Sequence, residues 1–200
     1  MSSRSKQFLN DPAHVVEESI RGLLWLRPDL MRLPGTSAVV TAAVDSTRVA
    51  ILTGGGAGHE PAHVGFVGKG LLDGAVSGDV FASPSHKAVV AAITHFRGAA
   101  GVLLVVKNYN GDCVNFKIAA EIARSQGIDV QTVIFGDDVV FSEVPNSDSR
   151  GIDLEMGVLI NETMSLLTTD EYYKMSVVVD RFVVGRFCTA LDMCVECHSL

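Results

Sequence analysis

The chain has 200 residues, of which 48% are hydrophobic and 20% charged, so it can bury the core of one domain. Its 16 Lys and Arg against 23 Asp and Glu give a formal net charge of -7 without a basic stripe, which argues against a nucleic-acid partner. No stretch reaches the roughly 18–20 apolar residues of a membrane span, and the first residues lack the apolar part of a signal peptide. We therefore expect a cytoplasmic protein with no membrane partner, which binds a small molecule or another protein.

Helices and strands are predicted to alternate from residue 11 to residue 135. A cap residue and a proline, Asp11-Pro12, begin a helix whose apolar residues recur at helical spacing through Leu24. Further helices are predicted from the Ser83-Pro84-Ser85-His86 cap through residue 96, and from residue 114 to Gly127. Strands are predicted over 38–44, 49–53, 101–106 and 130–135, with a glycine-dense connector over 65–76 and a short run over 80–82. This alternation is typical of an α/β fold, a mostly parallel sheet with helices on both faces.

The most informative segment, residues 53–63, places four glycines and two histidines directly after an apolar strand. Glycine permits a tight turn and a close approach of a ligand to the backbone. Three predicted loops follow strands, at residues 54–59, 107–112 and 136–138. Because parallel strands end at the same edge of a sheet, we expect the three loops to converge there on one ligand.

These loops carry a set of titratable side chains suited to proton transfer. His59 has a reference pKa near 6.5 and can act as a general acid or base, Asp112 can accept a hydrogen bond from a hydroxyl, and Lys107 can orient an oxygen or hold the carboxylate. For any one of them, ordinary capping or solvation is the alternative interpretation. The full set is His59, Glu60, His63, Lys107, Asp112, Asp137 and Asp138.

Neither common nucleotide-binding glycine motif fits. A phosphate loop requires Ser or Thr after Gly-Lys, but Gly70 follows Gly68-Lys69. The dinucleotide motif requires a glycine at the position of His59. Phosphate or dinucleotide binding by the glycine run is therefore not expected.

Five blocks of residues, in order and at similar spacing, resemble the sugar-binding domain of the dihydroxyacetone (glycerone) kinase family. With the opening helix, the resemblance covers about residues 6–141, which we interpret as the N-terminal lobe of that domain, and leaves 142–200 as a divergent tail. The blocks are Gly54-Gly55-Gly56-Ala57-Gly58-His59-Glu60-Pro61-Ala62-His63, residues 65–70, residues 78–84, Val106-Lys107-Asn108-Tyr109-Asn110-Gly111-Asp112 with Asn115-Phe116, and residues 136–138.

The resemblance implies a substrate and roles for individual residues. A triose, the ketose dihydroxyacetone or the aldose glyceraldehyde, would contact Gly56, Ala57, Gly58 and His59, while Lys107 and Asp112 would bind its hydroxyls. His59 and Asp112 would then assist proton transfer as a hydroxyl is phosphorylated. The family usually has Ser at the position of Ala57, so a hydroxyl contact worth about 0.5–1.5 kcal/mol is lost if the side chain makes it.

The resemblance also implies components that have no counterpart in this sequence. ATP and Mg²⁺ are the family's cofactors, but their binding domain is not in this chain, so the partner would be a full-length kinase, an ATP-binding domain or a second copy. The family's covalent histidine, in a Gly-Ile-His-Gly-Glu setting, is also missing, and we do not assign that role to His198. A non-catalytic ketose-binding or regulatory protein is therefore the alternative to a kinase, and a chain that does not fold stably alone is a third possibility.

Residues 142–200 offer several patterns that we do not interpret as sites. Strand-like runs over 175–184 could cover a sheet edge, but the abrupt loss of resemblance favours a truncated or altered gene product. Cys194-Val195-Glu196-Cys197-His198 fits the attachment pattern of c-type haem, and with Cys188 it offers zinc ligands. Unpaired cysteines are the preferred interpretation, so no metal site is predicted. The glycosylation pattern at Asn161 lacks a secretory signal and is read as an unmodified loop.

Overall fold

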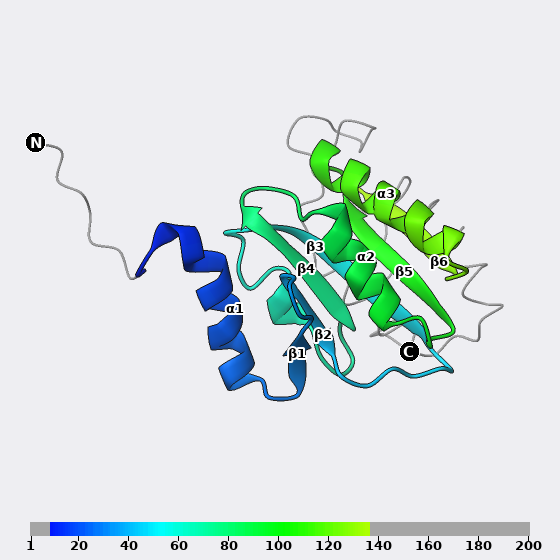
Figure 1. The fold of residues 1–200 in the computed structure, drawn as a ribbon, viewed down its shortest axis with the longest axis horizontal. Coiled ribbons are helices and arrows are strands. Elements are labelled where there is room, and N and C mark those ends of the chain that lie inside the picture. The colour runs from blue at the N-terminus through cyan, green and yellow to red at the C-terminus, as the bar shows by residue number, and fades with distance from the viewer. Residues whose placement is uncertain (1–8, 137–200) are drawn as a thin grey trace, which may run out of the picture.

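The fold is taken from a computed structural model that describes residues 9–136 (Figure 1). The Asp11 carboxylate caps the first helical turn and Ser85 caps α2, as the sequence predicts. The elements in chain order are η1 (Pro12–His14), α1 (Val15–Leu26), β1 (Leu30–Arg32), β2 (Ala38–Thr41), β3 (Val49–Ala57), η2 (Val64–Phe66), β4 (Gly74–Val80), α2 (His86–His95), β5 (Gly101–Lys107), α3 (Asn110–Ser125) and β6 (Val130–Phe135).

The six strands form one sheet in the order β1-β2-β4-β3-β5-β6. The strands from β4 to β6 are parallel, and β1 and β2 are added antiparallel at one side. β3 lies at the centre, where Leu52 is in register with Gly74 of β4 and with Leu104 of β5. The predicted α/β class with a mostly parallel sheet is confirmed.

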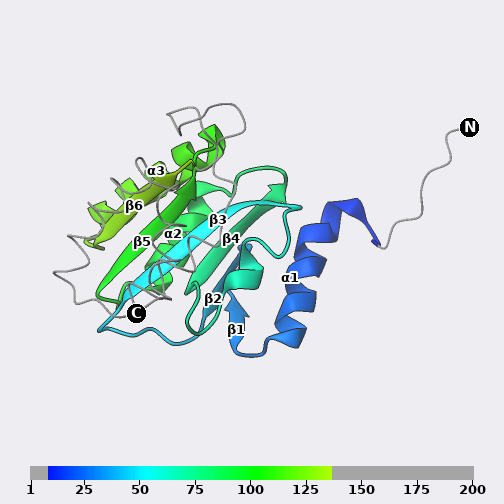
Figure 2. The same ribbon diagram turned by 180° about the vertical axis from the view of Figure 1, so that it is seen from behind.

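Each face of the sheet has its own apolar cluster. α2 and α3 lie on one face, where Phe96 and Phe116 pack against side chains of β3 and β5 (Figure 1). On the opposite face, Ile20 of α1 and Val64 of η2 belong to the second cluster (Figure 2). The central strands are therefore buried on both faces, which explains their continuous apolar runs.

The strand predicted over 38–44 ends at Thr41, and β1 was not predicted. Three further boundaries are wrong in the elements that carry the site. β3 continues through the glycine run to Ala57, so most of the predicted 54–59 turn is strand. The predicted connector over 65–76 ends in β4, whose residues Gly74–Ser77 pair in parallel with Leu52–Gly55. α3 begins at Asn110 instead of residue 114, so Asp112 lies in its first turn and not in a loop. Glycine has low strand propensity, so the sequence pattern did not show the end of β3 or the start of β4. The earlier start of α3 is favourable because it places the acidic Asp112 in the first helical turn.

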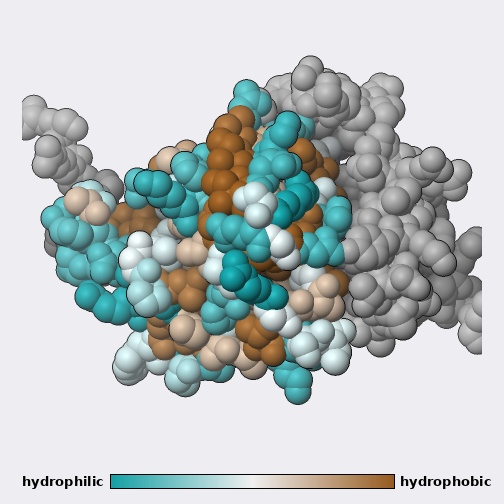
Figure 3. Space-filling model, turned by 45° about the vertical axis from the view of Figure 1, so that its right-hand side comes forward, coloured by the Kyte–Doolittle hydropathy of each residue, from teal (hydrophilic) through white to brown (hydrophobic). Residues whose placement is uncertain are grey.

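The side of the sheet formed by α3 and β6 exposes apolar residues. Val114 and Ile118 on α3 and Ile134 on β6 are among the exposed large hydrophobic side chains. Figure 3 brings this side of the molecule forward and shows apolar surface among hydrophilic side chains.

Within residues 9–136, no helix is both long and apolar enough to span a bilayer.

A buried hydroxyl joins the two central parallel strands below the site. Thr53 is fully buried, and its hydroxyl donates a hydrogen bond of 2.7 Å to the carbonyl oxygen of Val105. Thr53→Val keeps the shape and removes this bond, so we expect the free energy of unfolding to fall by about 0.5–1.5 kcal/mol. Chemical denaturation measures this, with Thr94→Val on the exposed side of α2 as the control. Equal losses in both variants would contradict the prediction.

Candidate functional site

The site lies where the parallel strands β3, β4 and β5 end. The last residues of these strands are Ala57, Val80 and Lys107, and Asp112 follows in the first turn of α3. His59 influences the pKa of both His63 and Asp112, and Lys107 influences the same two groups. The structure therefore brings four of the predicted titratable residues together. Asp137 and Asp138 lie outside the described residues.

Lys107 and Asp112 form the buried charged part of this site. Lys107 is 7% exposed and Asp112 is 4% exposed. Burial lowers the pKa of Lys107, and the nearby Asp112 carboxylate opposes that shift. Burial raises the pKa of Asp112, against a hydrogen bond from Ser83 and the charges of Lys107 and His59. Asp112 Oδ1 is buried without a hydrogen-bond partner among the described residues, so it can accept a bond from a ligand.

His63 is a buried neutral imidazole beside Lys107. Its side chain is 1% exposed, and its Nε2 has no hydrogen-bond partner among the described residues. Burial, with smaller contributions from Lys107 and His59, lowers the pKa of His63 to about 3. At neutral pH this ring adds a polar atom to the site without adding charge.

The glycine run is closely packed by other parts of the protein. A Cβ added at Gly55 would lie 2.5 Å from Cε1 of His63 and 3.1 Å from Nζ of Lys107. A Cβ added at Gly56 would lie 2.7 Å from the backbone nitrogen of Ala82. At Gly54 an added Cβ would meet the Val76 carbonyl and the ring of Phe116. These glycines are therefore needed for packing, a reason that the sequence interpretation, based on ligand approach, did not supply.

His59 lies at the exposed side of the site. Its ring contacts the ring of Phe81 edge to face, with 5.2 Å between the ring centroids and 68° between the planes. Just before it, Gly58 adopts a positive φ of 97°, and its N–H donates to the Glu60 carboxylate at 2.9 Å. Gly58 is thus a position where a tight turn requires glycine.

Two residues of the site were not predicted, Phe81 and Ser83, and both follow β4. Ser83 hydrogen-bonds Asp112, and Phe81 contacts His59. Both belong to the block 78–84 that carries the resemblance. The missing information was that β4 is parallel to β3 and ends at the same edge.

A polar hollow of about 470 Å³ adjoins Ser83 on the side of α1 and α2. Hydroxyl groups dominate its wall, and the first residues of α2 contribute to it. Its polar lining residues are Ser37, Ser77, Asp79, Ser83, Ser85, His86 and Asn115.

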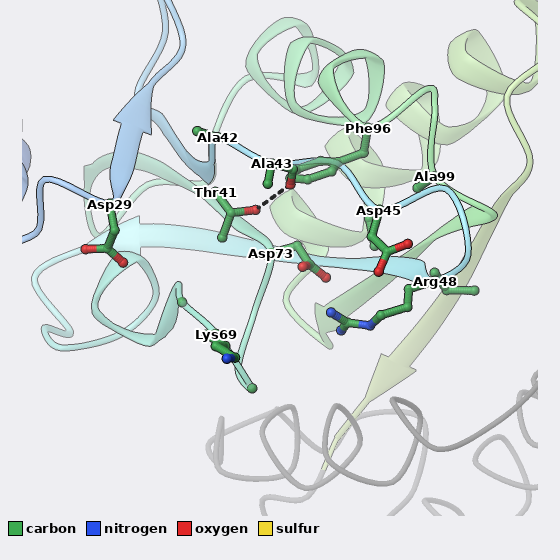
Figure 4. A pocket seen from close by; sticks show the side chains of 14 residues that line it. Asp29, Thr41, Ala42, Ala43, Asp45, Arg48, Lys69, Asp73, Phe96 and Ala99 are labelled. Atoms are coloured by element: carbon green, nitrogen blue, oxygen red, sulfur yellow. Dashed lines mark hydrogen bonds between the residues drawn. The ribbon is translucent and has the colours of Figure 1, made fainter.

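A second cavity, of about 430 Å³, lies at the other end of β3 and shares no residue with the site (Figure 4). Arg48, Lys69 and Asp73 line it, and the Asp73 carboxylate accepts a 2.8 Å hydrogen bond from the N–H of Ile51. The Gly68-Lys69-Gly70 segment is therefore at the edge opposite to His59.

The described residues of the site offer hydrogen-bonding groups for a small hydroxylated ligand. The site offers Asp112 as an acceptor, Lys107 as a donor and His63 as a neutral polar group. Residues 9–136 contain no cluster of three or more His, Cys, Asp or Glu side chains that could hold a metal ion. The cysteines considered as zinc or haem ligands lie outside the described residues.

Comparisons with known proteins agree on one family. The model of the Dak1 domain matches residues 21–159, which extends past Phe141. A dihydroxyacetone kinase from Citrobacter freundii is 48% identical over 153 residues, which are 74% of this chain and 27% of that protein. The chain thus spans about a quarter of the length of this relative.

Solved structures give the same result. The C. freundii dihydroxyacetone kinase in complex with AMP-PNP and Mg²⁺ superposes with a TM-score of 0.77 and 40% identity, over 89% of this chain and 34% of that one. A dihydroxyacetone kinase operon co-activator, Dha-DhaQ, superposes with a TM-score of 0.71 and 31% identity, over 81% of this chain and 51% of the other.

The depressed pKa of His63 predicts a pH-dependent stability. Between about pH 3 and 6.5 the folded protein binds fewer protons at His63 than the unfolded chain does. The contribution of His63 to the free energy of unfolding is therefore complete above pH 6.5 and is lost as the pH falls through this range. We expect His63→Gln to remove up to about 1.4 kcal/mol per pH unit of this dependence. Denaturation at several pH values measures the slope, with His14→Gln at an exposed position as control. Parallel slopes in the parent and in His63→Gln would mean that His63 is protonated in the folded state.

Proposed function

This chain belongs to the Dak1 domain family, and we propose that it binds dihydroxyacetone or glyceraldehyde at the edge formed by β3, β4 and β5. The observation that carries the proposal is the buried pair Lys107 and Asp112, with an unpartnered carboxylate oxygen. A small ketose has hydroxyl groups that can donate to that oxygen and a carbonyl that can accept from Lys107. Without such a ligand, the buried oxygen lacks a partner and is costly.

The proposed chemistry is the activation of a ketose hydroxyl for phosphorylation. Asp112 accepts the hydrogen bond of this hydroxyl, and its raised pKa makes it a stronger base than a solvated carboxylate. His59 lies on the exposed side and takes part in moving the proton, while Lys107 holds a substrate oxygen. Gly56, Ala57 and Gly58, which lie at the end of β3 directly before His59, line the ketose.

The phosphoryl donor is proposed to come from outside the described residues. The C. freundii kinase binds AMP-PNP and Mg²⁺, and ATP with Mg²⁺ would supply the phosphoryl group and neutralise its charge. Residues 9–136 offer no metal cluster for them, so a further domain or a partner chain would hold the nucleotide.

A regulatory ketose-binding protein is the second candidate. Its specific support is the likeness to the operon co-activator Dha-DhaQ, a relative that is named for regulation. In this alternative the same three strand ends bind the ketose, and no phosphoryl transfer follows.

The two candidates are separated by binding and turnover of the full chain. Titration with dihydroxyacetone, followed by NMR, is expected to show saturable binding because the buried pair is satisfied by the ligand. A coupled assay with ATP, Mg²⁺ and dihydroxyacetone is run on the chain alone and with the ATP-binding part of a relative. Turnover only with the added part supports the kinase, and binding without turnover in either case supports the regulator. Absence of binding would refute both.

Two substitutions test the assigned residues. We expect His59→Ala and Asp112→Asn to weaken dihydroxyacetone binding, Asp112→Asn by roughly tenfold or more because a charge-assisted hydrogen bond is worth about 1.5–3 kcal/mol. His14→Ala and Asp45→Asn, which lie away from this edge, serve as matched controls. Thermal unfolding shows that each variant is folded. If both site variants bind as the parent does, the site is located elsewhere.

A further inference from the structure

Phe81 has an unfavourable backbone conformation that its burial does not explain. Its φ is 55°, and within residues 9–136 no other non-glycine residue has a positive φ. The left-handed region is a true outlier for a bulky residue. Its side chain is 71% exposed, so the burial of apolar surface does not compensate for the strain.

The end of β4 and the glycine run of β3 hold this conformation in place. The N–H of Phe81 donates to the carbonyl of Ala57 at 2.9 Å, and the N–H of Ala82 donates to the carbonyl of Asp79 at 3.0 Å. The backbone of Phe81 and Ala82 lies directly on Gly56, within 3.0 Å of where a Cβ would be. Strained residues persist when their surroundings fix them in this way, and they concentrate at functional sites.

The conformation places the ring of Phe81 against the segment that carries His59. A Cβ at Gly58 would lie 2.9 Å from Cε1 of Phe81, and the edge-to-face contact with the His59 ring follows from this placement. The His59 side chain is exposed, and the contact found for its ring is the one with Phe81. The ring of Phe81 therefore restricts the orientation of the exposed His59 imidazole.

We propose that Phe81 is a positioning residue, whose strained conformation holds the His59 imidazole toward Asp112 and the bound ketose. The role of His59 rests on the proposed function, whereas the positioning itself does not. Aromatic pairs in this geometry attract each other beyond simple burial, and fixing a side chain before binding reduces the entropy lost on association. The strain at Phe81 is then a cost that the site tolerates for the orientation of His59.

The test uses the full chain with Phe81→Asn and Phe81→Tyr. Asn adopts the left-handed conformation more readily than Phe and removes the ring, while Tyr keeps the ring. The side-chain NMR signals of His59, assigned with His59→Ala, report on the ring contact. Dihydroxyacetone titration and thermal unfolding are measured on the same samples.

We expect Phe81→Asn to shift the His59 signals toward those of a free histidine and to weaken dihydroxyacetone binding by roughly threefold to tenfold. Its unfolding temperature should stay at or above that of the parent, and Phe81→Tyr should behave as the parent in all three measurements. Unchanged His59 signals in Phe81→Asn, or a lowered unfolding temperature, would overturn the proposal in favour of a packing role. If the parent does not bind dihydroxyacetone, the proposed function fails, while the His59 signals still decide whether Phe81 positions the ring.

Discussion

The close packing of neighbouring segments onto the glycine run of β3 is the constraint on which the site depends. Phe116 of α3 packs against Gly54, and His63 and Lys107 pack against Gly55. The backbone that follows β4 packs against Gly56. A protein interior is packed too tightly for these segments to yield to a methyl group. The glycines of this strand therefore fix where α3, the loop that carries His59 and His63, and the end of β4 meet. The polar and aromatic side chains of the site come from these three segments and from β5.

This packing also sets the electrostatics of the site. Because the segments approach so closely, Lys107, Asp112 and His63 are removed from water, and burial is the largest cause of each of their pKa shifts. A histidine next to a lysine would repel it if both were charged, and burial keeps His63 neutral. The Asp112 carboxylate acts on the charge of Lys107, and its Oδ1 has no hydrogen-bond partner among the described residues.

The sequence was sufficient for the fold class, for most elements and for the convergence of His59, Lys107 and Asp112. Strands such as β5 and β6 are apolar and β-branched, so their pattern is unambiguous. β4 and the end of β3 were not predicted as strands, because their glycines do not favour a strand by themselves. They form strands because they pair with each other. Phe81 and Ser83 could not be found without that pairing, since only the parallel direction of β4 brings them to this edge.

The site is thus made of two parts with different physical properties. Lys107, Asp112 and His63 form a buried floor, whose geometry is determined by core packing. His59 lies outside that floor, and its orientation depends on one exposed ring contact. In the proposed function, the buried floor provides most of the ketose binding and His59 adds to it, whereas proton transfer requires His59 at a defined distance and angle. Under this proposal, changes near Phe81 would weaken ketose binding several-fold but would remove the geometry that proton transfer needs, which is a physical route by which kinases and regulators of this family can share one fold.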